Sequence, residues 1–355
     1  MNKKCLIFFT IGIGDSLMVT PVLNKIKSLD GYEFHALTIS PQIKEIMENS
    51  GCFKRVYLIN FLKDKLTSSF SLLCAVEKEK YDLSILVYPS NHYKYRIVHF
   101  LTGSKKRYGI SYGTKNFPDL EFLSGKLIKE DRSLHAIEQN FRLFETALNI
   151  KLERDHKMTL NISDTDRKIA DGFVSSHSLN GKTLIGIHPG SDLFKNMEKK
   201  RWDPVKYSAL MKSYSDNDKV HFLIFGSKPE NLLMDAIHSG SSANSTAVKN
   251  TPFFHSAAII EKCGLFICGD TGLMHTAAAL NVPVIAIFGP TSSVYAGPLN
   301  EGSAVIKKDY ACIPCFEYSR TPLKCVQQDQ YKCIKDISVE DVKTVLDSKL
   351  KEQEK

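Results

Sequence analysis

The residues best suited to chemistry lie in a turn between an apolar run and a helical segment, at 270–275. Residues 265–268 are apolar and predict a buried strand, and residues 273–280 return at helical spacing with three alanines. A second apolar run at 284–288 completes a strand–helix–strand unit. Ligands of such sheets bind outside the carboxyl ends of the strands, where free amides and the helix dipole attract anions. The turn therefore predicts a site for a phosphate or a leaving oxyanion, formed by Asp270, Thr271, Gly272, Leu273 and His275.

A basic segment earlier in the same half can meet the same anion. A predicted strand at 183–188 ends in His-Pro-Gly-Ser191, and Lys200 and Arg201 stand just before a helix that begins near Pro204. Ammonium and guanidinium groups suit diphosphate oxygens, so Lys200 and Arg201 are candidate ligands. Two structural alternatives stay open. In the first, Asp270 and Thr271 cap the helix and have no other role. In the second, the basic segment is a solvated face that binds no ligand.

The first turn of the chain, residues 10–16, carries Asp15 behind two glycines. A carboxylate at the carboxyl end of the predicted strand 4–9 can take the proton of an attacking hydroxyl. Such general base catalysis accelerates a reaction by about 10²–10⁴-fold. The alternative is that Asp15 caps the following helix. A dinucleotide-binding fingerprint is disfavoured, because Leu17 stands where the third glycine is required and Asp15 would oppose a pyrophosphate.

Strands and helices alternate through both halves of the sequence, which predicts parallel sheets with helices on both faces. An irregular polar stretch at 152–164 places the domain boundary, and residues 112–131 show no period and predict a loop. The predicted domains are 1–160 and 161–335, with a C-terminal helix in 336–355. The predicted fold class is therefore α/β, with two Rossmann-like parallel-sheet domains. Asp164-Thr165-Asp166, which resembles a metal-binding pair, precedes a helical run and is interpreted as a cap.

The composition limits the class of protein. The 355 residues are 43% hydrophobic and 24% charged, as in soluble globular proteins, and no apolar run approaches the ~20 residues that span a bilayer. The N-terminus lacks the apolar stretch of a signal peptide, so a cytoplasmic location is expected. The net charge of +8 suits an anionic substrate or peripheral contact with an anionic inner-membrane leaflet. Nucleic acid is not expected as a partner, because no basic run is interleaved with aromatic residues.

Four of the nine cysteines crowd together near the end of the chain. The first two have the two-residue spacing of a zinc site, whereas seven residues separate the second two. Because the pattern fits only half of a zinc site, structural metal and isolated loop thiols both stay open, and no metal ligand is assigned. The four are Cys312, Cys315, Cys325 and Cys333.

Several of these motifs resemble the heptosyltransferase-like glycosyltransferases of family 9. The most specific is Asp-Thr-Gly-Leu-Met-His at 270–275 with Ala-Ala-Ala-Leu at 277–280, supported by His-Pro-Gly at 188–190, Lys-Arg-Trp at 200–202 and Phe-Gly-Pro-Thr at 288–291. The resemblance implies an inverting enzyme with Asp15 as base and with Lys200 and Ser191 on the phosphates. The same resemblance implies that the reaction needs neither a cofactor nor a metal. It also implies an acceptor-binding N-terminal domain and a donor-binding C-terminal domain that face each other across a cleft, the arrangement known as GT-B.

The expected partners follow from the same resemblance. They are a nucleotide-sugar donor, most simply ADP-heptose, and a lipid-linked glycan acceptor such as a lipopolysaccharide core. The alternative is a catalytically silent nucleotide-sugar-binding or assembly protein on the same scaffold.

Overall fold

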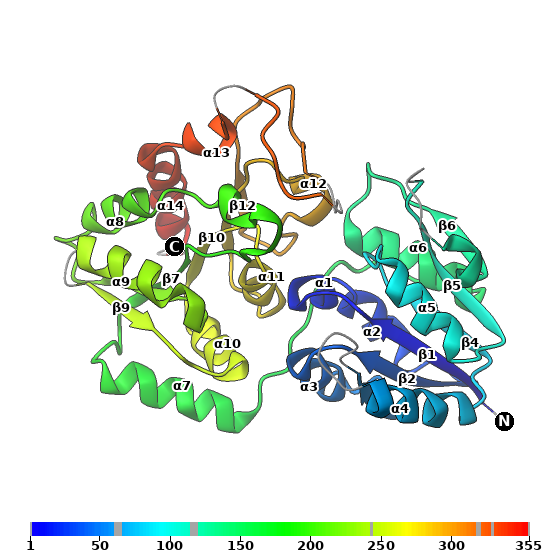
Figure 1. Cartoon of the computed structure of the whole chain (residues 1–355). Helices are drawn as coiled ribbons and strands as arrows, with labels where there is room; N and C mark the ends of the chain where they lie inside the picture. Colours follow the sequence, from blue (N-terminus) through cyan, green and yellow to red (C-terminus); the bar gives the residue numbers. More distant parts are fainter. Residues whose placement is uncertain are drawn as a thin grey trace. The chain divides into compact units, whose positions relative to one another are not determined.

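The computed structural model describes residues 2–59, 66–113, 120–241, 244–316, 321–327 and 330–353, with only the backbone for 66–70. The described chain forms two compact units, Met1–Asn161 and Ile162–Lys355. Figure 1 colours them in turn, blue to cyan-green and then green to red. Among the described residues, none of the helices combines the length and the apolar character needed to cross a membrane.

The first unit contains a six-stranded sheet in which every pairing is parallel (Figure 1). Its strand order is β3-β2-β1-β4-β5-β6. The strands are β1 (Lys3–Phe9), β2 (Tyr32–Thr38), β3 (Arg55–Leu58), β4 (Leu83–Leu86), β5 (Lys106–Ser111) and β6 (Lys126–Lys129). The helices are α1 (Ile13–Leu17), α2 (Thr20–Ile26), α3 (Pro41–Asn49), α4 (Leu66–Lys78), α5 (Tyr93–Leu101), the 3-10 turn η1 (Glu121–Ser124) and α6 (Ala136–Leu148).

The second unit repeats this topology with the order β12-β11-β10-β7-β8-β9, again all parallel. Its strands are β7 (Thr183–His188), β8 (Val220–Phe225), β9 (Ser245–Val248), β10 (Leu265–Gly269), β11 (Val284–Ile287) and β12 (Ala304–Ile306). The helices before β10 are α7 (Asp164–Ser176), η2 (Phe194–Lys200), α8 (Pro204–Lys212), η3 (Lys228–Glu230), α9 (Asn231–Gly240) and α10 (Phe253–Glu261). Those after it are α11 (Gly272–Ala279), α12 (Ser293–Ala296), α13 (Lys332–Lys335) and α14 (Val339–Gln353).

Both sheets reverse their strand order at one place, between β1 and β4 in the first unit and between β7 and β10 in the second. At such a switch point the loops at the carboxyl ends diverge and leave room for a ligand. The fold therefore selects the segments that follow these four strands as the places to look for a site.

The cores explain why the sheets form. Residues 5–9 of β1 are all fully buried, on both sides of the strand, as expected for a strand covered on both faces by helices. In the second unit Trp202 is buried, and its indole N–H donates to the carbonyl of Ile337 at 2.8 Å. This bond fixes the start of the C-terminal segment, and Val342 and Leu346 of α14 complete the same core. The C-terminal helix thus belongs to the second unit.

The structure differs from the sequence predictions in short segments. The predicted loop at 112–131 contains η1 and the edge strand β6, and the predicted turn at 10–16 already becomes helical at Ile13. The capping interpretation of Asp164 to Asp166 is confirmed, because Ser163 accepts a hydrogen bond from the amide of Asp166 at the start of α7.

Buried histidines predict that mild acid destabilises the fold. Burial first, and then the charges of Arg107 and Arg96, lower the pKa of His99 to about 3, although its bond to Ser84 opposes this. Burial likewise lowers the pKa of His221 to about 4. Since the unfolded chain binds protons near pH 6.5 and the folded chain does not, stability falls as the pH drops below about 6.5.

For His99 alone the expected loss at pH 5 is about 2 kcal/mol relative to pH 7. Thermal unfolding at the two pH values measures it. His99→Gln can keep a bond to Ser84 without titrating, and it should lose less stability in acid than the wild type. Equal acid sensitivity of the two proteins would contradict the assignment.

Candidate functional site

The turn after β10 presents an uncapped helix start. Helix α11 has Thr271 as its N-cap residue, with extended backbone and no hydrogen bond from its side chain to the helix. The amides of Gly272 and Leu273 open the helix and have no acceptor within it. Thr271 therefore does not serve as a side-chain cap, and the helix start keeps its capacity to bind an anion.

Asp270 and Lys200 form an ion pair at this helix start, with 2.8 Å between Nζ and Oδ2. Only 10% of the Lys200 side chain and 19% of the Asp270 side chain are exposed. Burial would raise the pKa of Asp270, but the charge and hydrogen bond of Lys200, with smaller contributions from His275 and Thr291, lower it overall. Lys200 is therefore no part of a solvated basic face. It places a fixed positive charge beside the first turn of α11.

Ser191 and Arg201 support the same region. The Arg201 guanidinium donates to Ser191 Oγ at 3.0 Å and to the Ser191 carbonyl, while Ser191 Oγ donates to the carbonyl of Met197 at 2.9 Å. Ser191 is buried at the start of the loop that leads to Lys200. Arg201 thus fixes the backbone of this loop, and its contact with a diphosphate stays a prediction.

His188 connects the two strands of the switch point. It is the last residue of β7, and its Nδ1 shares a 3.0 Å hydrogen bond with Oγ1 of Thr271, which follows β10. Its Nε2 faces Oε1 of Glu230 at 3.6 Å. The second Glu230 oxygen accepts from both the amide and the hydroxyl of Ser227, each at 2.7 Å. Burial alone would raise the pKa of Glu230, but His188 and Ser227 together lower it to about 2.

Gly190 makes this approach sterically feasible. A Cβ at that position would lie 1.7 Å from Glu230 Oε1 and 3.0 Å from His188 Nε2. The sequence singled out the His-Pro-Gly motif, but it did not identify Glu230 as a site residue. The available signal was the Ser227-x-x-Glu230 capping box, which the structure contains.

Asp15 lies in the first unit, at the third residue of α1. The N-cap of α1 is Gly12, so Asp15 is not the cap residue, and its side chain is half-buried. Nearby, Thr10 follows β1 and Ser90 follows β4, and their hydroxyls share a 2.9 Å hydrogen bond. Asp15 therefore follows the strand that borders the switch point of its own sheet.

The remaining predicted site residues cluster within the second unit. Thr271 and Asp270 contact His188 and Lys200, and His275 is buried close enough to lower the pKa of Asp270. Gly272 and Leu273 supply the first turn of α11. These predicted site residues thus lie together at one strand-to-helix turn.

The C-terminal cysteines are free thiols, with Cys333 buried and the other three half-buried. Burial first, and then the neighbouring sulfurs, raise the pKa of Cys333 to about 11 and also raise that of Cys315. Across the described part of the chain, no group of three or more His, Cys, Asp or Glu residues is arranged to hold a metal ion.

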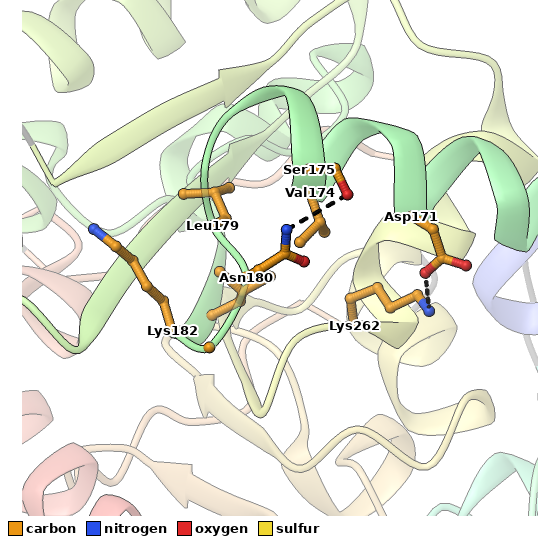
Figure 2. Close-up of a pocket in the computed structure, with 9 residues that line it drawn as sticks. Asp171, Val174, Ser175, Leu179, Asn180, Lys182 and Lys262 are labelled. Atoms are coloured by element: carbon orange, nitrogen blue, oxygen red, sulfur yellow. Dashed lines mark hydrogen bonds and ion pairs between the residues drawn. The ribbon is translucent and has the colours of Figure 1, made fainter.

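A pocket of about 410 Å³ lies elsewhere in the second unit, beside the segments that precede β7 and β10 (Figure 2). Among its lining residues, Lys262 forms an ion pair with Asp171 at 2.5 Å and Asn180 donates to Ser175 at 3.5 Å. Segments that precede parallel strands lie at the edge opposite to the carboxyl ends. The pocket is therefore separate from the site at α11, and it contains none of the predicted site residues.

Comparison with known proteins identifies the family. Residues 69–326 match glycosyltransferase family 9 (heptosyltransferase). The chain is 26% identical to lipooligosaccharide heptosyltransferase 2 of Campylobacter jejuni over 348 residues, which cover 96% of each chain.

Solved structures share the fold. A family 9 glycosyl transferase from Veillonella parvula superposes with a TM-score of 0.78 at 21% identity, covering 99% of this chain and 97% of the other. The ADP-heptose LPS heptosyltransferase II of E. coli gives 0.75 at 18% identity, covering 99% and 100%. The architecture is thus the two-Rossmann GT-B fold predicted from the sequence. With nearly three quarters of its length matched, the chain belongs to glycosyltransferase family 9 and is a heptosyltransferase-like enzyme.

Proposed function

We propose that this glycosyltransferase moves a heptose from ADP-heptose to the core of a lipopolysaccharide or lipooligosaccharide, with inversion at the anomeric carbon. The observation that carries the proposal is the buried Lys200–Asp270 pair beside the uncapped start of α11, at the switch point of the second sheet. In support, the Campylobacter relative is named a lipooligosaccharide heptosyltransferase, and the E. coli structure is named an ADP-heptose LPS heptosyltransferase.

In the proposed mechanism the second unit binds the nucleotide sugar. The Lys200 ammonium and the amides at the start of α11 hold the diphosphate, and Ser191 lies at the start of the loop that carries Lys200. These charges are fixed before the reaction, so they stabilise the leaving ADP without reorganisation. Asp270 keeps the ammonium oriented, because its buried carboxylate has Lys200 as its ion-pair partner.

The first unit would bind the acceptor. As an acceptor hydroxyl forms its bond to the anomeric carbon, its proton passes to the Asp15 carboxylate. The bond from that carbon to the diphosphate oxygen breaks on the opposite face, and its electron pair leaves with ADP. Attack opposite to the leaving group produces inversion.

The direct test uses purified protein, ADP-heptose and lipopolysaccharide cores truncated before each heptose. Mass spectrometry of the products should show one added heptose on one acceptor, with equimolar ADP. Donor binding without any product would instead identify a silent nucleotide-sugar-binding protein on the same scaffold.

We also propose peripheral contact with the inner membrane, where a lipid-linked acceptor resides. The net charge of +8 favours anionic lipids. The protein should co-sediment with vesicles that contain anionic phospholipid and be released by salt, since such attraction is screened. Equal binding to neutral vesicles would contradict an electrostatic contact.

A further inference from the structure

The imidazole of His188 lies between a hydroxyl, which can donate or accept a hydrogen bond, and a carboxylate, which accepts when ionised. Nδ1 is bonded to the Thr271 hydroxyl at 3.0 Å, and Nε2 faces the Glu230 carboxylate at 3.6 Å. The residue is 7% exposed, and Gly190 leaves the space for the carboxylate to approach the ring. The arrangement joins the end of β7, the last residue of η3 and the N-cap of α11.

The carboxylate decides which ring nitrogen keeps a proton. An ionised Glu230 carboxylate can only accept hydrogen bonds, and its Oε2 already accepts from the amide and the hydroxyl of Ser227. The neutral ring therefore carries its proton on Nε2, toward Glu230. The other nitrogen, Nδ1, then has a lone pair and accepts the proton of the Thr271 hydroxyl.

A second proton on the ring reverses this bond. In the imidazolium both nitrogens donate, so Nδ1–H donates to Thr271 Oγ1. The Thr271 hydroxyl proton is then released to point at another acceptor. At an N-cap beside Lys200, the acceptor that fits is an oxygen of a bound diphosphate.

We propose that His188 is a positioning residue whose second proton lets the Thr271 hydroxyl donate to the diphosphate, and that Glu230 holds the ring for this purpose. The inference deepens the proposed function and rests on the diphosphate lying at the start of α11. It adds a proton to the binding reaction, so the enzyme takes up a proton when the nucleotide binds.

The other charges around the ring are compatible with this exchange. Arg201 lies 3.7 Å from the same Glu230 oxygen and opposes a second positive charge. On the side of α11, the Lys200–Asp270 pair is neutral as a unit, and His275 interacts with Asp270. A bound diphosphate adds negative charge and therefore shifts the balance toward the imidazolium.

The test is ADP binding by calorimetry from pH 6.5 to 8.5, in buffers of different ionisation enthalpy. In the wild type the affinity should fall about tenfold over this range, as expected for loss of one hydrogen bond to a charged group, with proton uptake on binding. The terminal phosphate of ADP titrates near pH 6. Its growing negative charge would strengthen binding to Lys200, so it cannot mimic the expected fall.

Three variants separate positioning from a structural role. The amide nitrogen of His188→Asn can occupy the Nδ1 position and donate to Thr271 at every pH, so binding should persist with no pH dependence or proton uptake from this residue. Thr271→Val should abolish the same dependence while His188 stays in place. Thr271→Ser keeps the hydroxyl and should therefore show the pH dependence that Thr271→Val loses. A role of Thr271 in packing alone would not predict this difference.

The outcomes distinguish this inference from the function it rests on. A wild type whose ADP affinity does not fall with pH, or a His188→Asn variant that keeps the wild-type dependence, would overturn the role of His188 and leave the proposed function standing. ADP binding that Lys200→Met leaves unchanged would contradict the diphosphate site itself, and both proposals would fail together.

Discussion

Asp15→Asn should lower kcat for heptose transfer by about 10²–10⁴ while leaving the affinity for ADP unchanged. The amide has nearly the shape of the carboxylate but cannot take a proton from the acceptor hydroxyl. Asp15 lies in the first turn of α1 in the first unit, whereas the candidate diphosphate ligands are in the second. Steady-state kinetics, together with ADP binding by calorimetry, measures the two effects separately.

The substitution should not unfold the protein. Asp15 is half-buried within the first turn of α1 and is not its N-cap, so the amide removes a helix-dipole interaction of about 0.3–1 kcal/mol. Asp30→Asn, at an exposed carboxylate of the same unit, is the matched control and should behave as the wild type. If Asp15→Asn keeps wild-type turnover, another group must remove the proton.

The central strands could be predicted because their signals are local. Strands β1, β7 and β10 are continuous apolar runs that end in glycine-bearing turns. The rule that the carboxyl ends of parallel strands meet at one edge then placed Lys200 and Asp270 in one region, although 70 residues separate them.

Short edge strands could not be predicted in the same way. Strand β6 has four residues, Lys-Leu-Ile-Lys, none of which is buried, and β12 has three. An edge strand pairs on one side only and needs no continuous apolar run. Its formation depends on the neighbouring strand, which lies elsewhere in the sequence. The missed β6 within 112–131 follows from this.

The hydrogen-bond partners of the polar site residues were harder to predict, because they depend on which segments the tertiary structure brings together. Arg201 and Lys200 are adjacent in the sequence, yet one supports Ser191 and the other pairs with Asp270. Residue type alone does not separate these roles. Glu230 was overlooked for the same reason, since its partner His188 is brought to it by the pairing of β7 with β8.

Lys200→Met has the second large expected effect, because it removes the fixed positive charge beside α11. The loss of a preorganised group that meets leaving-group charge costs about 10²–10³ in rate, or roughly 2.7–4 kcal/mol. The variant should also bind ADP more weakly. In addition it leaves the buried Asp270 carboxylate without its ion-pair partner, which destabilises a fold by about 3–5 kcal/mol.

The double variant Lys200→Met/Asp270→Asn separates these two losses. Replacing the orphaned carboxylate with a neutral amide removes the buried charge, so thermal stability should return most of the way to the wild type. Activity should not return, since the ammonium that meets the diphosphate is still absent. Lys199→Met, at the exposed neighbouring lysine, is the control and should change neither quantity. Recovery of activity along with stability would mean that Lys200 serves the fold alone, and the leaving diphosphate would then depend on the amides and dipole of α11.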